Sequence, residues 1–485
     1  MHVAKSSQVN EIFDEISYCK GAACIMMITA YLGMELFRKG ICSYLEKHKY
    51  GNARTADLWA ALTEASGKDV KAFMGVWTKE VGYPVVSLSR SGGKLNMTQA
   101  RFLSNGKEIK QANAWWVPMS LLDSAAQCVT CDLRSVSGEV DGTPGMASDW
   151  VKGNAGQTGF YRIRYSDELL ACLGDAIESI KLSPVDRLGV QSDAFALAKA
   201  GQLPTDRALA LATRYINEQD FTVWSDLAGS LGDVMGTWAK EDAEYQQLQK
   251  LLLKVMGKIV DVVGWTPIAG EHALFPMLRP LIIGAVGRNG HEDVKKEALA
   301  RMYSSEGWQS VPADLRFAVF SIVVAHGGVK GFDSVLKVFK EADMAEERVR
   351  ALRGLGYARE PELIDRLLQM TLDDSIRAQD VFYVYGTLAG NRYAMDRAWE
   401  FIKTNWEAIC KMFSSGQFLL GRILKSATSA FTSEAKAAEV EAFFKDKDTP
   451  GAERSISQAL ETIRLNAQWL ERDRAVVKAW LASNV

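Results

Sequence analysis

The sequence predicts a mainly α-helical protein with one small β domain, and three observations lead to this expectation. Apolar residues recur at helical spacing up to about residue 83 and again from residue 168 to the end. Between these stretches the pattern changes to short runs rich in β-forming residues. With 485 residues, the chain exceeds what one core usually serves. We therefore expect three parts, at residues 1–83, 84–167 and 168–485.

The first part reads as a set of helices. Leu32, Leu36, Ile41 and Leu45 recur near helical spacing, and a further helix is predicted to begin at Thr55. These helices are typical of the closing piece of a larger domain.

The second part reads as strands separated by Gly, Asn, Ser and Asp clusters. In its last run Tyr161, Ile163 and Tyr165 alternate with Arg162 and Arg164, as in a strand with one solvated face. The predicted strands lie in residues 85–89, 94–102, 115–122, 128–133 and 159–165. So many short strands in about eighty residues predict a β-sandwich.

The third part is helical to the end of the chain. Proline residues interrupt it at intervals, and Pro361 occupies a helix-start position. Near the end, one apolar stripe contains Ile456, Ala459, Leu460, Ile463, Ala467 and Leu470. More than about 300 residues of short helices are too many for one bundle, so we expect a curved α-solenoid of helical hairpins, similar to HEAT or armadillo arrays.

Composition excludes several classes of protein. The 57 Lys and Arg nearly balance the 59 Asp and Glu, so no nucleic-acid footprint is indicated. The apolar run at residues 21–34 is well short of the ~20 residues that cross a bilayer, so we expect no membrane partner. Seven cysteines, an odd number, and an N-terminus without an apolar signal core favour a cytoplasmic protein.

The sequence offers little for metal binding. Cys128 and Cys131 form one Cys-x-x-Cys, which is either half of a zinc knuckle, a redox pair, or two small residues of a strand. No second pair completes it, and the alternating apolar pattern around it favours the strand. The five histidines form no His-x-x-x-His pair, so the helical metalloprotease motif is absent from these 485 residues.

Tyr18 is the most informative single residue. It precedes Gly21 and a small uncharged helix, where its hydroxyl can donate a hydrogen bond and stabilise a developing oxyanion. The alternative is a half-buried aromatic side chain at a helix start.

The order of these parts, with the Tyr18 segment, resembles the C-terminal half of the M1 zinc aminopeptidases, most nearly their cytosolic puromycin-sensitive members. The similarity covers essentially the whole chain. It includes residues 13–22 (FDEISYCKGA), 52–59 (NARTADLW), 116–118 (WVP), 156–162 (GQTGFYR), 184–189 (PVDRLG), 223–227 (VWSDL), 313–316 (ADLR), 377–380 (RAQD) and 452–458 (AERSISQ).

The resemblance implies an enzyme that removes N-terminal residues from peptides with one zinc ion. It implies that the first part closes a thermolysin-like catalytic domain, and that the helical array encloses the substrate. The zinc ligands and the general base of the family would precede Met1, so we expect no zinc to be bound by this chain and a missing N-terminal catalytic part as its partner. On the matching positions, Tyr18 is the oxyanion donor and Phe13 a wall of the pocket for the first side chain of the substrate.

Two arginines are candidates for holding the C-terminal side of a peptide in the helical array. Arg377 and Arg422 each interrupt apolar sequence with a bidentate donor. The alternative is that they form structural salt bridges with neighbours such as Asp380.

Two functions follow from this. The first is the C-terminal portion of a zinc metallo-aminopeptidase, which we expect to be inactive by itself because a lone tyrosine has neither a nucleophile nor a base. The second is a non-catalytic helical-repeat module that binds peptides or proteins.

Overall fold

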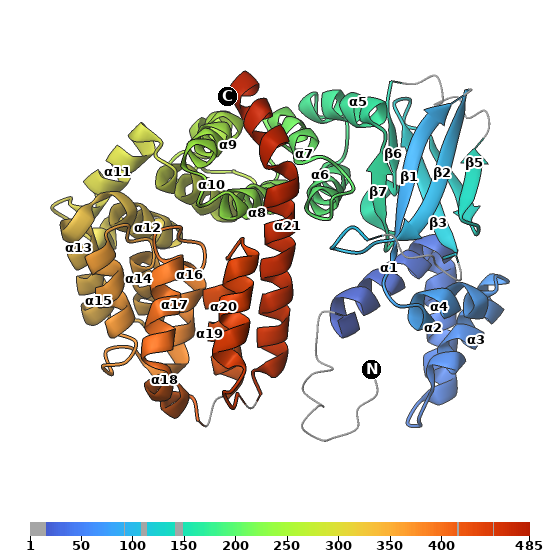
Figure 1. The fold of residues 1–485 in the computed structure, drawn as a ribbon. Coiled ribbons are helices and arrows are strands. Elements are labelled where there is room, and N and C mark those ends of the chain that lie inside the picture. Colours follow the sequence, from blue (N-terminus) through green and yellow to red (C-terminus); the bar gives the residue numbers. More distant parts are fainter. Residues whose placement is uncertain (1–15, 92, 108–113, 141–148, 415–416, 450) are drawn as a thin grey trace. The chain divides into compact units, whose positions relative to one another are not determined.

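The computed structural model describes residues 16–91, 93–107, 114–140, 149–414, 417–449 and 451–485. The chain forms two compact units, Met1–Leu203 and Pro204–Val485, called unit 1 and unit 2. Helices prevail in both units, and all strands among the described residues belong to unit 1 (Figure 1). The prediction of a mainly helical protein with a small β part is confirmed.

Unit 1 begins with a group of short helices. They are a π-helical turn (Ile16–Lys20), α1 (Gly21–Leu32), α2 (Met34–His48), α3 (Thr55–Ser66) and α4 (Val70–Lys79). Helix α1 ends at Leu32 and is followed by Gly33, whose φ of 87° lies in a region that glycine adopts readily. The chain bends by 115° between α1 and α2. Helix α3 begins at Thr55 as predicted, because the Asp57 carboxylate accepts a hydrogen bond from the Arg54 backbone N–H at 2.7 Å.

None of the described helices is by itself long and apolar enough to cross a bilayer. The bent pair of α1 and α2 passes such a test only when the two helices are counted together.

Two small sheets follow α4, and their strand orders are β5-β2-β1-β7 and β4-β3-β6. The strands are β1 (Pro84–Ser91), β2 (Lys94–Arg101), β3 (Val117–Asp123), β4 (Cys128–Leu133), β5 (Ser137–Val140), β6 (Val151–Gly153) and β7 (Arg162–Tyr165). Neighbouring strands are antiparallel except for β1 and β7. All five predicted runs contain a strand, whereas β5 and β6 are too short to show an alternating pattern in the sequence.

The two sheets come into contact where β6 carries a glycine. A Cβ at Gly153 would lie 2.8 Å from Cδ1 of Leu88 in β1 and 3.1 Å from Cδ1 of Ile163 in β7. Glycine therefore allows this close approach. The complete β-sandwich layout stays a prediction.

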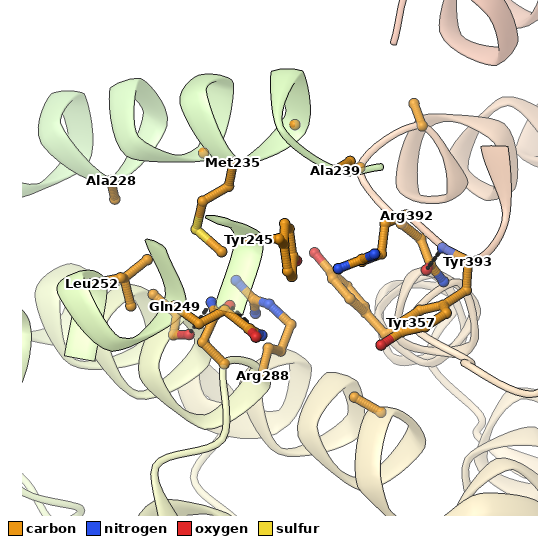
Figure 2. Close-up of a pocket in the computed structure, with 18 of the residues that line it drawn as sticks. Ala228, Met235, Ala239, Tyr245, Gln249, Leu252, Arg288, Tyr357, Arg392 and Tyr393 are labelled. Atoms are coloured by element: carbon orange, nitrogen blue, oxygen red, sulfur yellow. Dashed lines mark hydrogen bonds between the residues drawn. The ribbon is translucent and has the colours of Figure 1, made fainter. Parts of the chain in front are cut away.

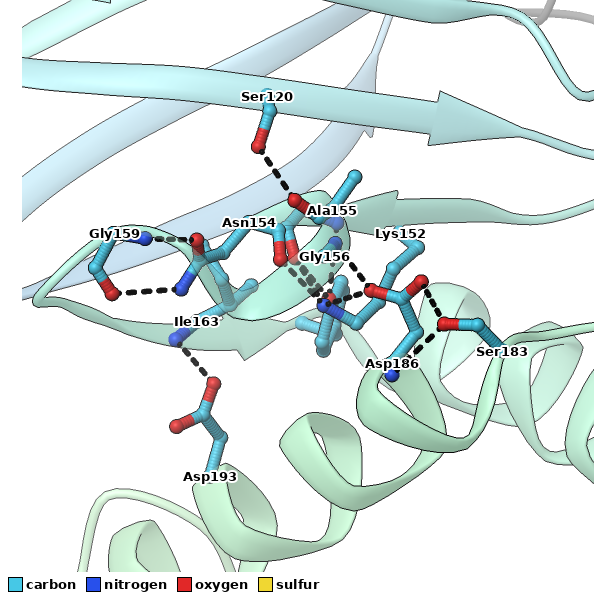
Figure 3. A network of polar contacts seen from close by, with 12 residues as sticks. Ser120, Lys152, Asn154, Ala155, Gly156, Gly159, Ile163, Ser183, Asp186 and Asp193 are labelled. Carbon is cyan, nitrogen blue, oxygen red and sulfur yellow. Dashed lines mark hydrogen bonds and ion pairs between the residues drawn. The ribbon is translucent and has the colours of Figure 1, made fainter. Parts of the chain in front are cut away.

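Helices α5 (Asp167–Glu178) and α6 (Pro184–Lys199) complete unit 1, and a buried polar network joins α6 to the strands (Figure 3). Lys152 is 1% exposed; its Nζ donates to the Gly153 carbonyl oxygen at 2.6 Å and lies 3.5 Å from Oδ1 of Asp186 in α6. Asp193, also in α6, accepts a hydrogen bond from the backbone N–H of Ile163 at 2.9 Å. Burial lowers the pKa of Lys152, and the negative charges of Asp186 and Asp193 oppose this shift. Burial raises the pKa of Asp193, and nearby positive charges oppose this shift.

These contacts bind the start of the third predicted part to the β part. Unit 1 thus extends through Leu203, and the division of the chain at residues 83 and 167 stays a prediction.

Unit 2 is built from helices that pack on their near neighbours in sequence (Figure 1). They are α7 (Thr205–Ala212), α8 (Phe221–Thr237), α9 (Asp242–Val263), α10 (Phe275–Arg288), α11 (Glu292–Met302), α12 (Arg316–His326), α13 (Gly328–Glu341), α14 (Ala345–Leu355), α15 (Pro361–Gln369), α16 (Val381–Leu388), α17 (Met395–Thr404), α18 (Trp406–Met412), α19 (Gln417–Thr428), α20 (Glu434–Phe444) and α21 (Glu453–Asn484). Helix α15 begins at Pro361, as predicted. The solenoid layout stays a prediction.

Helix α21 links the two ends of unit 2. Its 32 residues contact α19 and α20 and also α7, α8 and α9. Where α21 contacts α7, the Trp469 indole N–H donates to Oγ1 of Thr205 at 2.8 Å, and that hydroxyl donates to Asp473 at 2.5 Å. The helices at the start of unit 2 are therefore held by its last helix.

The apolar stripe predicted for α21 is fully buried at three of its six positions. Ile456, Ala459 and Ile463 are buried, and further along the buried positions include Asn466 and Trp469. Leu460, Ala467 and Leu470 are half-buried. The polar Asn466 is tolerated in the core because its amide donates to the carbonyl oxygen of Ser429 at 2.9 Å.

Candidate functional site

Tyr18 lies in the π-helical turn that precedes α1. Such turns are rare and frequently occur at functional sites. The Tyr18 side chain is 62% exposed, so it is a surface residue of unit 1 and not the half-buried aromatic of the alternative interpretation. Its position is compatible with hydrogen-bond donation to a ligand.

Lys20 anchors this turn, and sequence analysis missed it. Its Nζ donates to the carbonyl oxygens of Gly82 at 3.2 Å and Glu80 at 3.4 Å, just after α4. Burial lowers the pKa of Lys20 and raises the pKa of Cys24, which lies one turn further along. The turn that carries Tyr18 is therefore tied to the rest of unit 1 by a lysine whose charge is partly desolvated.

Phe13, the predicted wall of the substrate pocket, lies outside the described residues. Its role stays a prediction.

The two candidate arginines of unit 2 lie beside the start of α16. Arg377 precedes this helix, and its Nε donates to Asp380 at 2.7 Å, the salt bridge that the alternative interpretation named. Arg422 on α19 places its guanidinium carbon 4.5 Å from the ring centroid of Phe382 and 5.8 Å from that of Phe418. Both arginines are exposed, so neither the salt bridge of Arg377 nor the ring contacts of Arg422 prevent an additional contact with a ligand.

Unit 2 also contains a pocket of about 460 Å³ that sequence analysis did not find. Figure 2 shows Ala228 and Met235 of α8, and Ala239 just beyond its end, on one side, with Tyr245 and Arg392 reaching in from other segments. Its other principal lining residues are Ser225, Gly229, Gly232, Gly236, Gln249, Leu252, Arg288, Asn289, Tyr357, Arg359, Asn391 and Tyr393.

A buried asparagine holds one wall of this pocket. The Asn391 amide donates to the carbonyl oxygens of Gly356 at 2.9 Å and Ala358 at 2.6 Å, and its own oxygen accepts from the backbone N–H of Tyr393 at 3.0 Å. The loop before α17 is thereby fixed against the loop before α15. These two loops supply Arg392 and Arg359.

Each pocket arginine contacts a tyrosine ring. The guanidinium carbon of Arg288 lies 4.8 Å from the Tyr357 ring centroid, and that of Arg392 lies 4.2 Å from the Tyr245 centroid. Such stacking holds the planar groups in place. Burial raises the pKa of Tyr245, so its hydroxyl stays protonated at neutral pH.

Only one sequence signal could have pointed to this pocket. Small residues recur along α8 at Ser225, Gly229, Gly232 and Gly236, close to one helical period. The arginines come from separate loops, and their convergence is a tertiary feature.

The described residues contain no group of three or more His, Cys, Asp and Glu side chains that could hold a metal ion. Cys128 and Cys131 both lie on β4, as the strand interpretation predicted, and both are free. Residues three apart on a strand point to opposite faces, which argues against a shared metal.

Two family models match this chain. Residues 150–465 match the family described as ERAP1-like C-terminal domain, and residues 1–77 match the peptidase family M1 domain. The chain belongs to the M1 aminopeptidase family. Aminopeptidase 2, mitochondrial, of Saccharomyces cerevisiae is 34% identical over 490 residues, covering 99% of this chain and 51% of the yeast protein.

Two plant relatives of this M1 family member give the same result. Aminopeptidase M1 of Arabidopsis thaliana is 34% identical, covering 97% of this chain and 55% of its own length, and Aminopeptidase M1-B of Oryza sativa is 36% identical with the same coverage. The chain therefore spans about half the length of the curated relatives it matches.

The zinc ion expected for an M1 aminopeptidase finds no set of ligands among the described residues. No step of a reaction is therefore assigned to a metal held by these residues.

Proposed function

We propose that this chain is the C-terminal portion of a zinc metallo-aminopeptidase that removes N-terminal residues from peptides. Family membership over essentially the whole chain carries the proposal, together with the coverage of only about half of each relative. In this proposal the zinc, which supplies an activated water, is held by the part of the relatives that this chain does not match. The isolated chain is then inactive, and the missing N-terminal catalytic part is its partner.

Tyr18 is the residue proposed to act directly on the reaction. Its hydroxyl donates a hydrogen bond to the oxygen that becomes negative when the scissile carbonyl is attacked. Its exposure on a turn anchored by Lys20 supports this role. Phe13 is proposed to line the pocket for the first side chain of the peptide.

Unit 2 is proposed to enclose the rest of the peptide. Arg377 and Arg422 are retained as candidates for contacts with its C-terminal side, since both are exposed. The cytoplasmic location stays a prediction.

The decisive experiment compares the isolated chain with the full-length natural protein in hydrolysis of an aminoacyl fluorophore. We expect turnover only for the full-length protein, lost with a chelator and restored by zinc. Turnover by the isolated chain, or none by the full-length protein, would contradict the proposal. Peptide binding without turnover in the full-length protein would support the alternative of a non-catalytic binding module.

A further inference from the structure

The loop between β6 and β7 meets the turn that carries Tyr18. This loop is residues 154–160, and Phe160 at its end makes two contacts with the start of the described chain. The Lys20 ammonium nitrogen lies 5.8 Å from the centroid of the Phe160 ring. The backbone N–H of Phe160 donates to Sδ of Met27, a buried residue of α1, at 3.5 Å. One residue of the β part therefore touches both the turn and the helix that follows it.

The ring of Phe160 is held by two other aromatic rings. Its centroid lies 6.4 Å from that of Trp77 in α4, which it meets edge to face, and 4.9 Å from that of Tyr83. The Tyr83 hydroxyl accepts a hydrogen bond from Nε of Arg162 in β7 at 3.3 Å. Ring pairs of this kind stabilise one relative arrangement of their planes. The Phe160 side chain is thus fixed between α4 and the strands.

The backbone of the loop is also fixed. Asn154 is buried at a φ of 54°, which is uncommon for a residue other than glycine. Its amide donates to the carbonyl oxygen of Gly159 at 3.1 Å, and its side-chain oxygen accepts from the Gly159 N–H at 2.9 Å (Figure 3). The Gly156 N–H donates to Asp186 of α6 at 2.7 Å. These bonds close the loop on itself and tie it to a helix, so Phe160 is presented from a rigid frame.

Three separate segments meet at the Lys20 ammonium, two residues after Tyr18. The carbonyl oxygens of Gly82 and Glu80 accept its hydrogen bonds at 3.2 Å and 3.4 Å, and the Phe160 ring lies beside it. The face of an aromatic ring attracts a cation, and the attraction grows as the cation loses water. Lys20 is half-buried. The ring therefore contributes to holding the ammonium, and with it the turn.

We propose that Phe160 is a positioning residue for the Tyr18 hydroxyl and that it acts through Lys20. The inference rests on the proposed function, in which Tyr18 donates a hydrogen bond to the developing oxyanion. Catalysis is sensitive to such placement, because an error of about 1 Å in a reacting group can lower the rate roughly 10²-fold. The β part then contributes to the reaction without touching the substrate, by setting where the donor of the preceding helical part stands.

Steady-state kinetics of the full-length natural protein on an aminoacyl fluorophore tests this. Phe160→Leu keeps an apolar side chain but removes the ring face, and it should lower kcat at least about fivefold. The KM should change less than about twofold, because the oxyanion forms only in the transition state. Phe160→Tyr keeps the ring and should retain kcat within about twofold. Unchanged kcat in Phe160→Leu would overturn the proposal.

The matched control is Phe102→Leu. Phe102 is another half-buried phenylalanine of the β part, and its ring stacks on the same Tyr83 ring at 5.4 Å between centroids. Its ring receives the guanidinium of Arg162, at 5.4 Å, in place of the Lys20 ammonium. We expect kcat of Phe102→Leu to lie within about twofold of the unmodified enzyme. A loss equal to that of Phe160→Leu would show that any weakened packing in the β part has the same effect, and would overturn the proposal.

A double-mutant cycle separates positioning from general damage. In an enzyme that already carries Tyr18→Phe, the hydroxyl to be positioned is gone, so adding Phe160→Leu should change kcat less than about twofold. General damage would lower kcat by the same factor with and without the Tyr18 hydroxyl, and that result would refute the positioning role. Phe160→Met, which also lacks a ring, takes the place of the leucine variant in the cycle if that variant does not fold.

Hydrogen exchange of the isolated chain, followed by mass spectrometry, needs no turnover. Phe160→Leu and Lys20→Met should each accelerate exchange of the amides in residues 16–24 at least about fivefold, and Phe102→Leu should not. Unchanged exchange in Phe160→Leu would contradict the anchoring, whatever the activity. Absence of turnover in the unmodified full-length protein would instead refute the proposed function, so the two failures are distinguishable.

Discussion

At the scale of single residues, the exposed side chain of Tyr18 and the partly desolvated ammonium of Lys20 lie on one turn. The Lys20 ammonium donates hydrogen bonds to the backbone beyond α4, which holds the turn that carries Tyr18. A donor fixed before the reaction stabilises a transition state without reorganisation.

Replacement of Tyr18 by phenylalanine in the full-length enzyme is expected to lower kcat about 10²–10³-fold, because one oxyanion donor is lost while the ring is kept. Steady-state kinetics on an aminoacyl fluorophore measures this. Tyr50→Phe is the matched control, since Tyr50 is a fully exposed tyrosine of the same unit. Equal kcat values for the two variants would remove Tyr18 from the mechanism.

His326 makes stability depend on pH. Its pKa of about 4 in the folded chain lies below the ordinary value of 6.5, so between these values the unfolded chain binds a proton that the folded chain does not. Stability must then fall as pH falls through this window. Between pH 7 and pH 5 we expect wild type to lose about 1 kcal/mol more unfolding free energy than His326→Gln, a figure discounted for partial solvent screening.

Urea denaturation of both proteins at pH 8, 7 and 5 checks this. Between pH 8 and pH 7 the two should change alike, since both values lie above the window. Parallel losses between pH 7 and pH 5 would show that His326 titrates normally.

At the scale of elements, the Lys152 network joins strand β6 to helix α6. The ammonium is satisfied by two backbone carbonyl oxygens and by Asp186, whose carboxylate also accepts from the Gly156 backbone N–H at 2.7 Å. A buried charge that loses its partner is far more costly than an exposed one. This contact therefore stabilises the packing of α6 against the strands.

Lys152→Met should lower the unfolding free energy of unit 1 by about 3 kcal/mol or more, because Asp186 would stay buried without a cation. Chemical denaturation measures the loss. Lys94→Met breaks the exposed pair with Glu139 in the same unit and should cost less than about 1 kcal/mol. Similar costs for both variants would mean that the buried pair contributes no more than a surface one.

At the scale of the whole molecule, unit 2 has a core of its own. Helix α21 contacts helices at both ends of the unit, and the hydrogen bonds that join Thr205, Trp469 and Asp473 lie wholly within it. Such a unit satisfies the usual conditions for independent folding.

Residues 204–485 expressed alone should therefore unfold in one cooperative transition, followed by circular dichroism. A fragment of residues 204–452, which lacks α21, should not, because the early helices of the unit lose the side chains that cover them. A disordered 204–485 fragment would show that unit 2 depends on unit 1.

Much of this architecture was predictable from local patterns. The helical and β-rich parts, five of the seven strands among the described residues, and the starts of α3 and α15 followed from periodicity and from helix-start signals. Strands β5 and β6 were missed because three or four residues carry no period. The burial of Asn466 in α21 was not expected, because its side chain finds backbone partners in the core that no sequence pattern shows.

The sequence by itself determined the class of fold and, through matches spread along the chain, the family and the candidate Tyr18. Those properties depend on order and spacing, which the sequence contains directly. Only the tertiary structure showed that Arg377 is paired with Asp380, that Lys20 anchors the turn of Tyr18, and that Arg288, Arg359 and Arg392 line one pocket of unit 2. Convergence of charges from separate loops depends on how helices pack, and packing is set by contacts between residues far apart in the chain.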